Sequence, residues 1–230
     1  MSTNSQRPKH RDAALSSLNV AVEGVNLAKE LSGVTPAKAV FGTVSVILTM
    51  IRDTVGQAMC LDSLAWLLRG DNQLDAAEEA ASRAIDLLSE GDNQFLVCRC
   101  RRGLGYIYHS GGKTEKAIHH YEVALGIASS FNWHDEVFWI HHSLASLFFD
   151  RNRFDDAISH IEHSKSLAVN NPYNLARAME LQARVWCQQR RFEQAKSEAL
   201  RAMEVFEKHG AALDLERCNK LLGRINSALN

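Results

Sequence analysis

One sequence pattern recurs four times at intervals close to 40 residues, and it limits the possible folds more than any other feature. An alanine marks the same point in each copy, and the copies are spaced by 40, 40 and 38 residues, at Ala77, Ala117, Ala157 and Ala195. Self-similarity at a fixed period of this length is typical of arrays of stacked structural units. The chain is therefore predicted to form a repeat protein with a continuous core shared between neighbouring units.

Each copy places small and large residues at the spacing of an α-helix. A small residue precedes a large one by three positions, in the pairs Ala65 and Leu68, Gly105 and Tyr108, Ala145 and Phe148, and Ala183 and Trp186. A polar turn and the anchoring alanine follow, and another small residue comes seven positions later, at Ala84, Ala124, Ser164 and Ala202. Small residues let antiparallel helices approach closely, and large ones fill the gaps between pairs. Each copy is predicted to be a helical hairpin.

These residues resemble the signature of the tetratricopeptide repeat (TPR), and the resemblance covers residues 57–230. It implies an all-α, TPR-like α-solenoid of about four hairpins, at 57–94, 95–134, 135–174 and 175–214, with a capping helix at 215–230. The predicted apolar stripe of that helix consists of Leu215, Cys218, Leu222, Ile225 and Leu229. The departures from the family pattern are the longer period, Ser164 in place of alanine, Gln182 in place of leucine, and a single inter-repeat proline, Pro172.

The stretch "SGGKT" (Ser110 to Thr114) contains the last three residues of a phosphate-binding P-loop. A Walker A motif also needs a glycine five positions before its last glycine, where this chain has Ile107, and it should follow a buried strand. The stretch is in register with the polar turns of the other three copies. We expect its glycines to serve the turn, where a positive φ costs them little, and Lys113 to be solvated.

The residues before the repeats carry a different pattern. Residues 1–11 are polar and are expected to be disordered, and residues 12–56 are predicted to form an N-terminal helical hairpin without the repeat signature. The segment from Leu18 to Thr54 resembles the start of the helical signalling domain of fungal NOD-like (STAND) receptors. In those receptors a nucleotide-binding NTPase domain follows, and here the repeats begin instead. The resemblance implies self-association or membrane engagement of the N-terminal helices as an alternative, cell-death type of signalling function.

Composition and charge narrow the classes of function. The formal net charge is −1, and the repeat region holds 20 basic and 23 acidic residues, which disfavours binding to a nucleic-acid backbone. Five cysteines at scattered positions and a polar N-terminus indicate a reducing, cytoplasmic setting. The longest nearly apolar run has 13 residues, and a membrane-spanning helix needs about 20, so membrane contact is expected only through the N-terminal helices.

No pattern of catalytic residues is found, so we expect a protein that is not an enzyme and that uses no cofactor. The chain has ten histidines, and His160 and His163 have a spacing that can chelate a metal ion. A third ligand cannot be identified from the sequence, and histidines that are packed or solvated are the simpler interpretation. No metal site is therefore predicted.

The residues expected to bind a partner lie on the exposed stripe of the first helix of each hairpin, which lines the concave groove in TPR stacks. They are Arg99, Arg102, Tyr106, His109, Trp139, His142, Phe149, Arg177, Glu180 and Arg184. Arginine and aromatic residues dominate interface hot spots, and arginine pairs with carboxylates through two hydrogen bonds. The sequence therefore predicts a scaffold or sensor arm that binds a protein or an acidic peptide. The simpler alternative is that these aromatic residues pack between repeats and the arginines are solvated.

Overall fold

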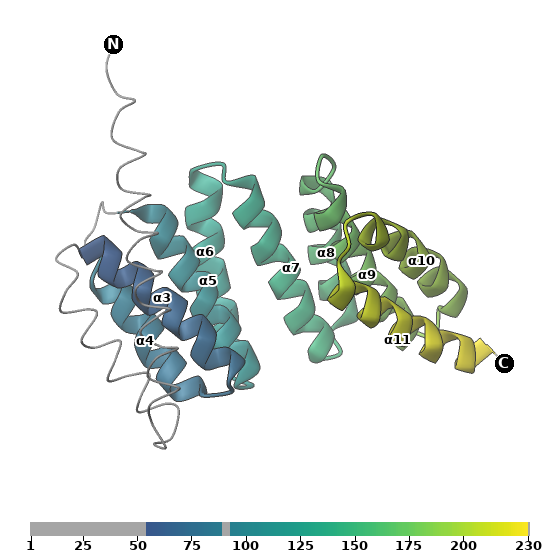
Figure 1. Ribbon diagram of the computed structural model, residues 1–230, viewed down its shortest axis with the longest axis horizontal. Coiled ribbons are helices and arrows are strands. Elements are labelled where there is room, and N and C mark those ends of the chain that lie inside the picture. Colours follow the sequence, from purple (N-terminus) through teal and green to yellow (C-terminus); the bar gives the residue numbers. More distant parts are fainter. Residues whose placement is uncertain (1–53, 89–92, 230) are drawn as a thin grey trace, which may run out of the picture. The chain divides into compact units, whose positions relative to one another are not determined.

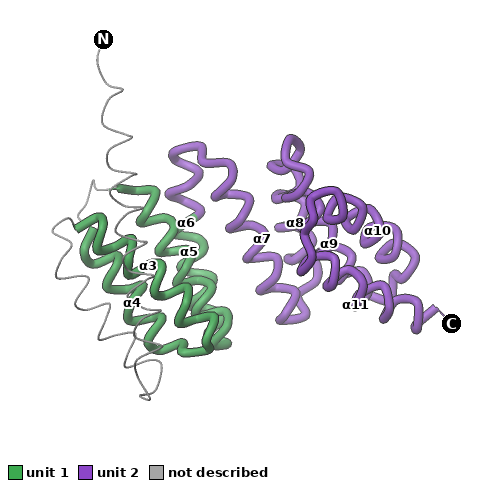
Figure 2. The backbone as a smooth tube through the Cα atoms, viewed as in Figure 1, with its two compact units in different colours: residues 1–124 green, residues 125–230 purple. Residues whose placement is uncertain are grey.

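The computed structural model describes residues 54–88 and 93–229, all of whose regular elements are α-helices (Figure 1). The chain divides into two compact units, one up to Ala124 and the other from Leu125 onward (Figure 2). Unit 1 contains α3 (Thr54–Gly70), α4 (Leu74–Asp86), α5 (Gln94–Ser110) and the first part of α6 (Thr114–Ser130). Unit 2 contains the end of α6 and five helices: α7 (His134–Asp150), α8 (Phe154–Leu167), α9 (Pro172–Gln188), α10 (Phe192–Lys208) and α11 (Ala212–Leu229).

The helices form consecutive antiparallel hairpins, as the repeat pattern predicts. The pairs α3 and α4, α7 and α8, and α9 and α10 are in extensive contact. First helices of successive hairpins also touch, α3 against α5 in unit 1 and α7 against α9 in unit 2, and α9 contacts α11. The predicted class, an all-α TPR-like repeat fold, is confirmed.

The turns inside the four hairpins share one backbone conformation. The second residue after each first helix has a left-handed φ angle, at Asn72 (59°), Gly112 (72°), Asn152 (58°) and Arg190 (60°). In each turn the next residue's N–H donates to the carbonyl of the large residue of the first helix, with N to O distances of 2.8 to 2.9 Å. This is the Schellman arrangement, which satisfies carbonyls at a helix end. Gly112 thus serves the turn as expected, which accounts for the glycine of the Gly-Lys-Thr sequence.

The small residues of the pattern are buried where the helices come closest. The four anchoring alanines are fully buried, and so are the small residues seven positions later, including Ser164. At Gly105 a Cβ atom would lie 2.5 Å from Cε1 of Tyr121, because this fully buried ring packs directly against the α5 backbone. Close approach, rather than a special backbone conformation, requires glycine here.

The polar departure at Gln182 is explained by a buried network between two hairpins. Gln182 is 3% exposed; it donates to Oε1 of Glu162 (2.7 Å) and accepts from Nζ of Lys165 (2.8 Å). Lys165 also contacts Glu198, which is paired in turn with Arg201. Buried polar groups are tolerated when each has its partners. An amide therefore replaces leucine without leaving an unsatisfied group.

The first helix of each repeat and the last helix begin slightly before the predicted repeat and cap starts. The helices begin at Thr54, Gln94, His134, Pro172 and Ala212, one to three residues before the predicted repeat and cap starts. Asn93 and Asn171 explain two of these starts, because their side chains accept hydrogen bonds from the N–H groups of Leu96 and Asn174. In α11 the buried stripe consists of Asp214, Cys218, Leu221 and Ile225. Two residues of the predicted stripe differ: Leu222 is only partly buried and Leu229 is exposed.

The N-terminal predictions lie almost wholly outside the described residues. The tail at 1–11 and the hairpin at 12–56 fall there, apart from residues 54–56, which open α3. The resemblance to fungal receptors concerns the same segment and stays a prediction. Among the described helices, none is long and apolar enough to cross a membrane.

Candidate binding surface

Four of the seven lysines and arginines in the described part of unit 1 lie on its first helices, α3 and α5. Helix α5 has three arginines and no acidic residue, and α3 has one arginine and one aspartate. Helix α4, the second helix of the first hairpin, has four acidic residues and one arginine. Although the whole chain is almost neutral, basic residues in unit 1 therefore gather on first helices and acidic residues on α4, a second helix.

We define the first-helix face of unit 1 as the following residues of α3 and α5: Asp62, Trp66, Arg69, Arg99, Arg102 and Tyr106. Two of its arginines, Arg69 and Arg102, lie next to its two aromatic rings. The Trp66 and Tyr106 ring centroids are 5.2 Å apart. The Arg69 guanidinium carbon lies 4.7 Å from the Trp66 centroid and 5.7 Å from that of Tyr106. Arg102 approaches Tyr106 to 5.9 Å. Guanidinium groups at these distances are attracted by the negative faces of aromatic rings.

Arg99 is held in place by a buried carboxylate. Its Nη2 atom lies 2.7 Å from Oδ2 of Asp62, whose side chain is only 1% exposed. Burial raises the pKa of Asp62, and the nearby Arg99 opposes that rise. The guanidinium group of Arg99 has five N–H donors, and Asp62 contacts only one of its nitrogens. The pair therefore orients Arg99 and leaves it further N–H groups that can donate to a ligand. Nearby, the predicted residue His109 lies half-buried in the last turn of α5.

The arginines of unit 2 are engaged with neighbouring side chains. Arg177 lies 5.1 Å from the Trp139 ring centroid and 3.7 Å from Oδ1 of Asp214. Asp214 also accepts a hydrogen bond from the Tyr173 hydroxyl (2.6 Å) and pairs with Arg217. Helix α11 therefore ties down the first-helix residues of the preceding hairpin.

The remaining predicted residues of unit 2 form a partly buried cluster. Arg184 covers the Phe149 ring at 4.6 Å from its centroid. Glu180 is 4% exposed, and burial raises its pKa against the influence of Arg184, Arg217 and Arg177. His142 lies 6.0 Å from the Trp139 ring, and burial lowers its pKa to about 4. His142 is consequently neutral at physiological pH, and the Glu180 carboxylate lies beneath the surface.

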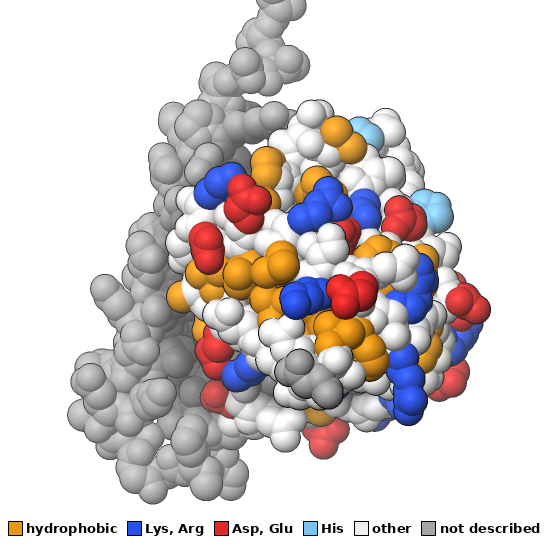
Figure 3. Space-filling view, turned by 90° about the vertical axis from the view of Figure 1, so that its right-hand side faces the viewer, with side chains coloured by type: hydrophobic (Ala, Val, Ile, Leu, Met, Phe, Trp, Pro, Cys, Tyr) orange, Lys and Arg blue, Asp and Glu red, His pale blue; other side chains and the backbone are white. Residues whose placement is uncertain are grey.

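Charge also distinguishes unit 2 from unit 1. Helix α7 has three acidic residues and no lysine or arginine, while α9 has two arginines and one glutamate. At the end of the molecule shown in Figure 3, acidic and basic side chains lie interspersed among apolar ones. We define the first-helix face of unit 2 as the following residues of α7, α9 and α11: Trp139, His142, Phe149, Arg177, Glu180, Arg184, Asp214 and Arg217.

Three histidines, His141, His160 and His163, gather elsewhere in unit 2. The Nδ1 atoms of His141 and His160 are 2.9 Å apart, and the His163 ring stacks on His141 with centroids 5.0 Å apart. Burial and the two neighbouring histidines lower the pKa of His141 to about 4. Within residues 54–88 and 93–229, no group of three potential ligands is arranged to hold a metal ion.

Sequence reasoning missed five residues of these faces: Asp62, Trp66, Arg69, Asp214 and Arg217. The register could have identified the first three, because they precede the predicted residues Arg102, Tyr106 and His109 by 40 positions. Asp214 and Arg217 belong to the capping helix, whose packing against α9 is a tertiary contact with no sequence signal of its own.

Comparison with known proteins supports the TPR-like fold. A tetratricopeptide-repeat family profile matches residues 103–131, which include Gly105, Tyr108, Ala117 and Ala124. No match was found among curated proteins. The chain thus carries a recognisable tetratricopeptide repeat in its second hairpin.

Solved structures with similar folds are distant in sequence. Aspartyl phosphate phosphatase F from Bacillus subtilis has a TM-score of 0.77 and 14% identity, covering 97% of this chain and 60% of that one. A STAND protein with a tetratricopeptide repeat sensor from Pyrococcus horikoshii has a TM-score of 0.73 and 10% identity, covering 92% and 32%. A Rap protein in complex with competence and sporulation factor has a TM-score of 0.68 and 14% identity, covering 100% and 64%. The chain spans less than two thirds of each of these proteins.

Proposed function

We propose that this protein is a non-enzymatic interaction scaffold or sensor arm that binds an acidic segment of a partner protein. The proposed binding surface consists of the residues predicted from the sequence, with Glu180 supporting it from below: Arg99, Arg102, Tyr106, His109, Trp139, His142, Phe149, Arg177, Glu180 and Arg184. The observation that carries the proposal is the charge separation in unit 1, where α5 has three arginines and no acidic residue. A TPR-like fold is compatible with this class of function, and the similar Rap protein was solved with a bound factor.

The first-helix face of unit 1 supplies the main contacts in this proposal. Arg102 and the oriented Arg99 offer N–H donors to partner carboxylates, since arginine binds carboxylates through charge-assisted hydrogen bonds. Tyr106 and Trp66 supply flat apolar surface beside these charges. Aromatic and arginine side chains together are characteristic of interface hot spots.

The first-helix face of unit 2 contributes differently. Its two first helices carry four acidic residues and only two arginines, so they add less attraction for an acidic partner. Trp139 and Phe149 are proposed as apolar anchors, and Glu180 acts from beneath the surface by holding the surrounding arginines. A cytoplasmic location belongs to the same proposal; all five cysteines are unpaired, which suits a reducing compartment.

A random peptide library displayed on phage tests the proposal without a known partner. Peptides selected by the wild-type protein should be enriched in aspartate and glutamate, and an Arg102→Glu variant should lose them. The matched control is Arg83→Glu, which makes the same charge change in unit 1 on the exposed side of α4. Selected peptides without an acidic excess, or equal binding by Arg102→Glu, would contradict the proposal.

A further inference from the structure

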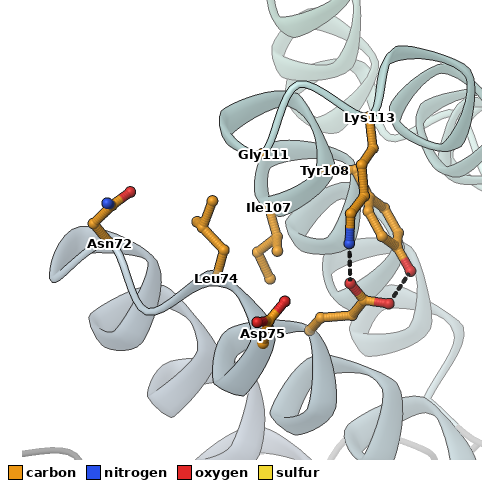
Figure 4. Close-up of a pocket in the computed structure, with 8 residues that line it drawn as sticks. Asn72, Leu74, Asp75, Ile107, Tyr108, Gly111 and Lys113 are labelled. Atoms are coloured by element: carbon orange, nitrogen blue, oxygen red, sulfur yellow. Dashed lines mark hydrogen bonds and ion pairs between the residues drawn. The ribbon is translucent and has the colours of Figure 1, made fainter.

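A pocket lies in unit 1, at the turn ends of its first two hairpins (Figure 4). It has a volume of about 260 Å³ and lies between Leu74, Asp75 and Glu78 on one side and Ile107, Tyr108 and Lys113 on the other. We call it the turn pocket. Pockets that hold drug-sized ligands have about 300 to 1,000 Å³, so this one suits a single side chain.

The turn pocket combines an apolar interior with acidic groups. Leu74 and Ile107 point into the space between the two turns in Figure 4, with Asp75 below them. Glu78 accepts hydrogen bonds from the Tyr108 hydroxyl (2.8 Å) and from Lys113 Nζ (3.2 Å). Lys113 is therefore an ion-pair partner, which corrects the expectation of a merely solvated turn residue.

The charges of the pocket leave one carboxylate uncompensated. Lys113 offsets Glu78, while the exposed Asp75 makes no hydrogen bond or ion pair within the described part of the chain. Partial burial raises the pKa of Glu78, but the hydrogen bonds from Tyr108 and Lys113 together with the charges of Lys113 and Lys116 outweigh it, so the pKa is lowered and Glu78 stays ionised. The lining residues Asp75, Glu78 and Lys113 carry a net charge of −1 at neutral pH, with Lys116 beside the Tyr108 ring, whereas α5 carries three arginines and no acidic residue.

We propose that the turn pocket binds a cationic side chain, an arginine or a lysine, of a partner protein. Such side chains lay an aliphatic stem along apolar surface and keep the charged head in contact with polar groups. The stem would lie against Leu74 and Ile107, and the head would pair with Asp75. This site does not depend on the acid-binding face, because it uses other residues and the opposite charge.

The same register in the third hairpin provides a matched control. Asp155 lies 80 residues, or two repeats, after Asp75 and occupies the same position in the first turn of its helix. Ile158 replaces Glu78 at the corresponding position. A role of Asp75 in favouring the helix N-terminus would be shared by Asp155, whereas a role in binding a cation would belong to Asp75 alone.

The probe is Nα-acetyl-arginine N-methylamide, titrated into the ¹⁵N-labelled full chain while backbone amide shifts are followed by NMR. We expect saturable shifts at residues 72–78 and 107–113 with a dissociation constant of about 1 mM or weaker, as is usual for so few atoms. The acetyl-citrulline analogue, which has a similar shape and no charge, should bind at least about threefold more weakly, since an exposed ion pair contributes up to about 1 kcal/mol.

Three variants complete the test. Asp75→Asn should weaken binding at least about threefold, Asp155→Asn should leave it unchanged, and Lys113→Gln should tighten it about twofold to fivefold by removing the competing cation. The proposal is overturned if citrulline binds as well as arginine, if Asp75→Asn has no effect, or if no saturable shifts occur at the two turns. None of these outcomes depends on whether the first-helix face binds acidic peptides.

Discussion

The first helices of unit 1 and unit 2 occupy equivalent places in their hairpins, yet they use arginine in different ways. The first helices of unit 1 have four arginines and one aspartate, and Arg69 and Arg102 lie over the rings of Trp66 and Tyr106. In unit 2, α7 has no lysine or arginine, and Arg177 is tied to Asp214 of the capping helix. A shared repeat scaffold therefore does not imply a uniform surface, and attraction for an acidic partner is expected mainly from unit 1.

The largest expected effect concerns the close packing that supports the unit 1 face. Gly105 of unit 1 corresponds to Ala145 of unit 2, and the ring of Tyr121 corresponds to the smaller Ile161. Gly105→Ala should lower the free energy of unfolding by about 2 kcal/mol, because the new Cβ would lie 2.5 Å from the Tyr121 ring. Urea denaturation measures the change.

The control for this variant is Gly126→Ala in α6, where a Cβ would have no atom within 4 Å. It should raise the free energy of unfolding by up to about 1 kcal/mol through helix propensity alone. Equal responses of the two variants would show that Tyr121 does not pack against α5 as described.

A smaller effect on stability is expected in unit 2, where the partly buried His141 packs against two other histidines. Its pKa is lowered to about 4, against about 6.5 in the unfolded chain, so folding favours the neutral ring. The stabilising contribution is complete above pH 6.5 and falls as pH drops from 6.5 towards 4. At pH 5 the loss should be about 1 to 2 kcal/mol.

His141→Gln should remove that part of the pH dependence, measured as the difference in unfolding free energy between pH 7 and pH 5. The exposed His134 at the start of α7 provides the control, since His134→Gln should leave the dependence unchanged. If His141→Gln has the same pH dependence of unfolding as the wild type, the lowered pKa of His141 does not contribute to stability as described.

The smallest expected effect lies in the turns. Arg190 adopts the left-handed conformation that asparagine or glycine adopts in the other three hairpins. Arg190→Gly should stabilise the protein by up to about 1 kcal/mol, because glycine takes a positive φ without the cost borne by a side chain. Thermal unfolding measures this gain in stability. A lower melting temperature of Arg190→Gly would indicate that the Arg190 side chain makes a contact that outweighs the cost of its positive φ.

The fold was predictable because its signals are local and repeated. Ala77, Ala117, Ala157 and Ala195 specify the helix contacts, and the polar turns specify the reversals. The stripe of α11 was partly wrong, since Leu221 rather than Leu222 is buried. Adjacent leucines differ by only one helical position, and the choice between them depends on how α11 packs against α10.

The candidate surface was harder to predict because its properties arise from contacts between helices. The sequence shows that Arg99 and Arg177 share a stripe, but not that Asp62 and Asp214 pair with them. It also gives no reason to expect Glu180 to be buried. The repeat register shows which residues share a stripe. Which of their charges are paired with other side chains could be seen only in the tertiary structure.

The central claim is that unit 1, rather than unit 2, supplies the main attraction for an acidic partner. The most direct measurement is isothermal titration calorimetry of one library-selected acidic peptide against wild type, Arg102→Glu, Arg184→Glu and the Arg83→Glu control. We predict an affinity loss of about tenfold or more for Arg102→Glu, a clearly smaller loss for Arg184→Glu and almost none for Arg83→Glu. A larger loss for Arg184→Glu than for Arg102→Glu would contradict the account.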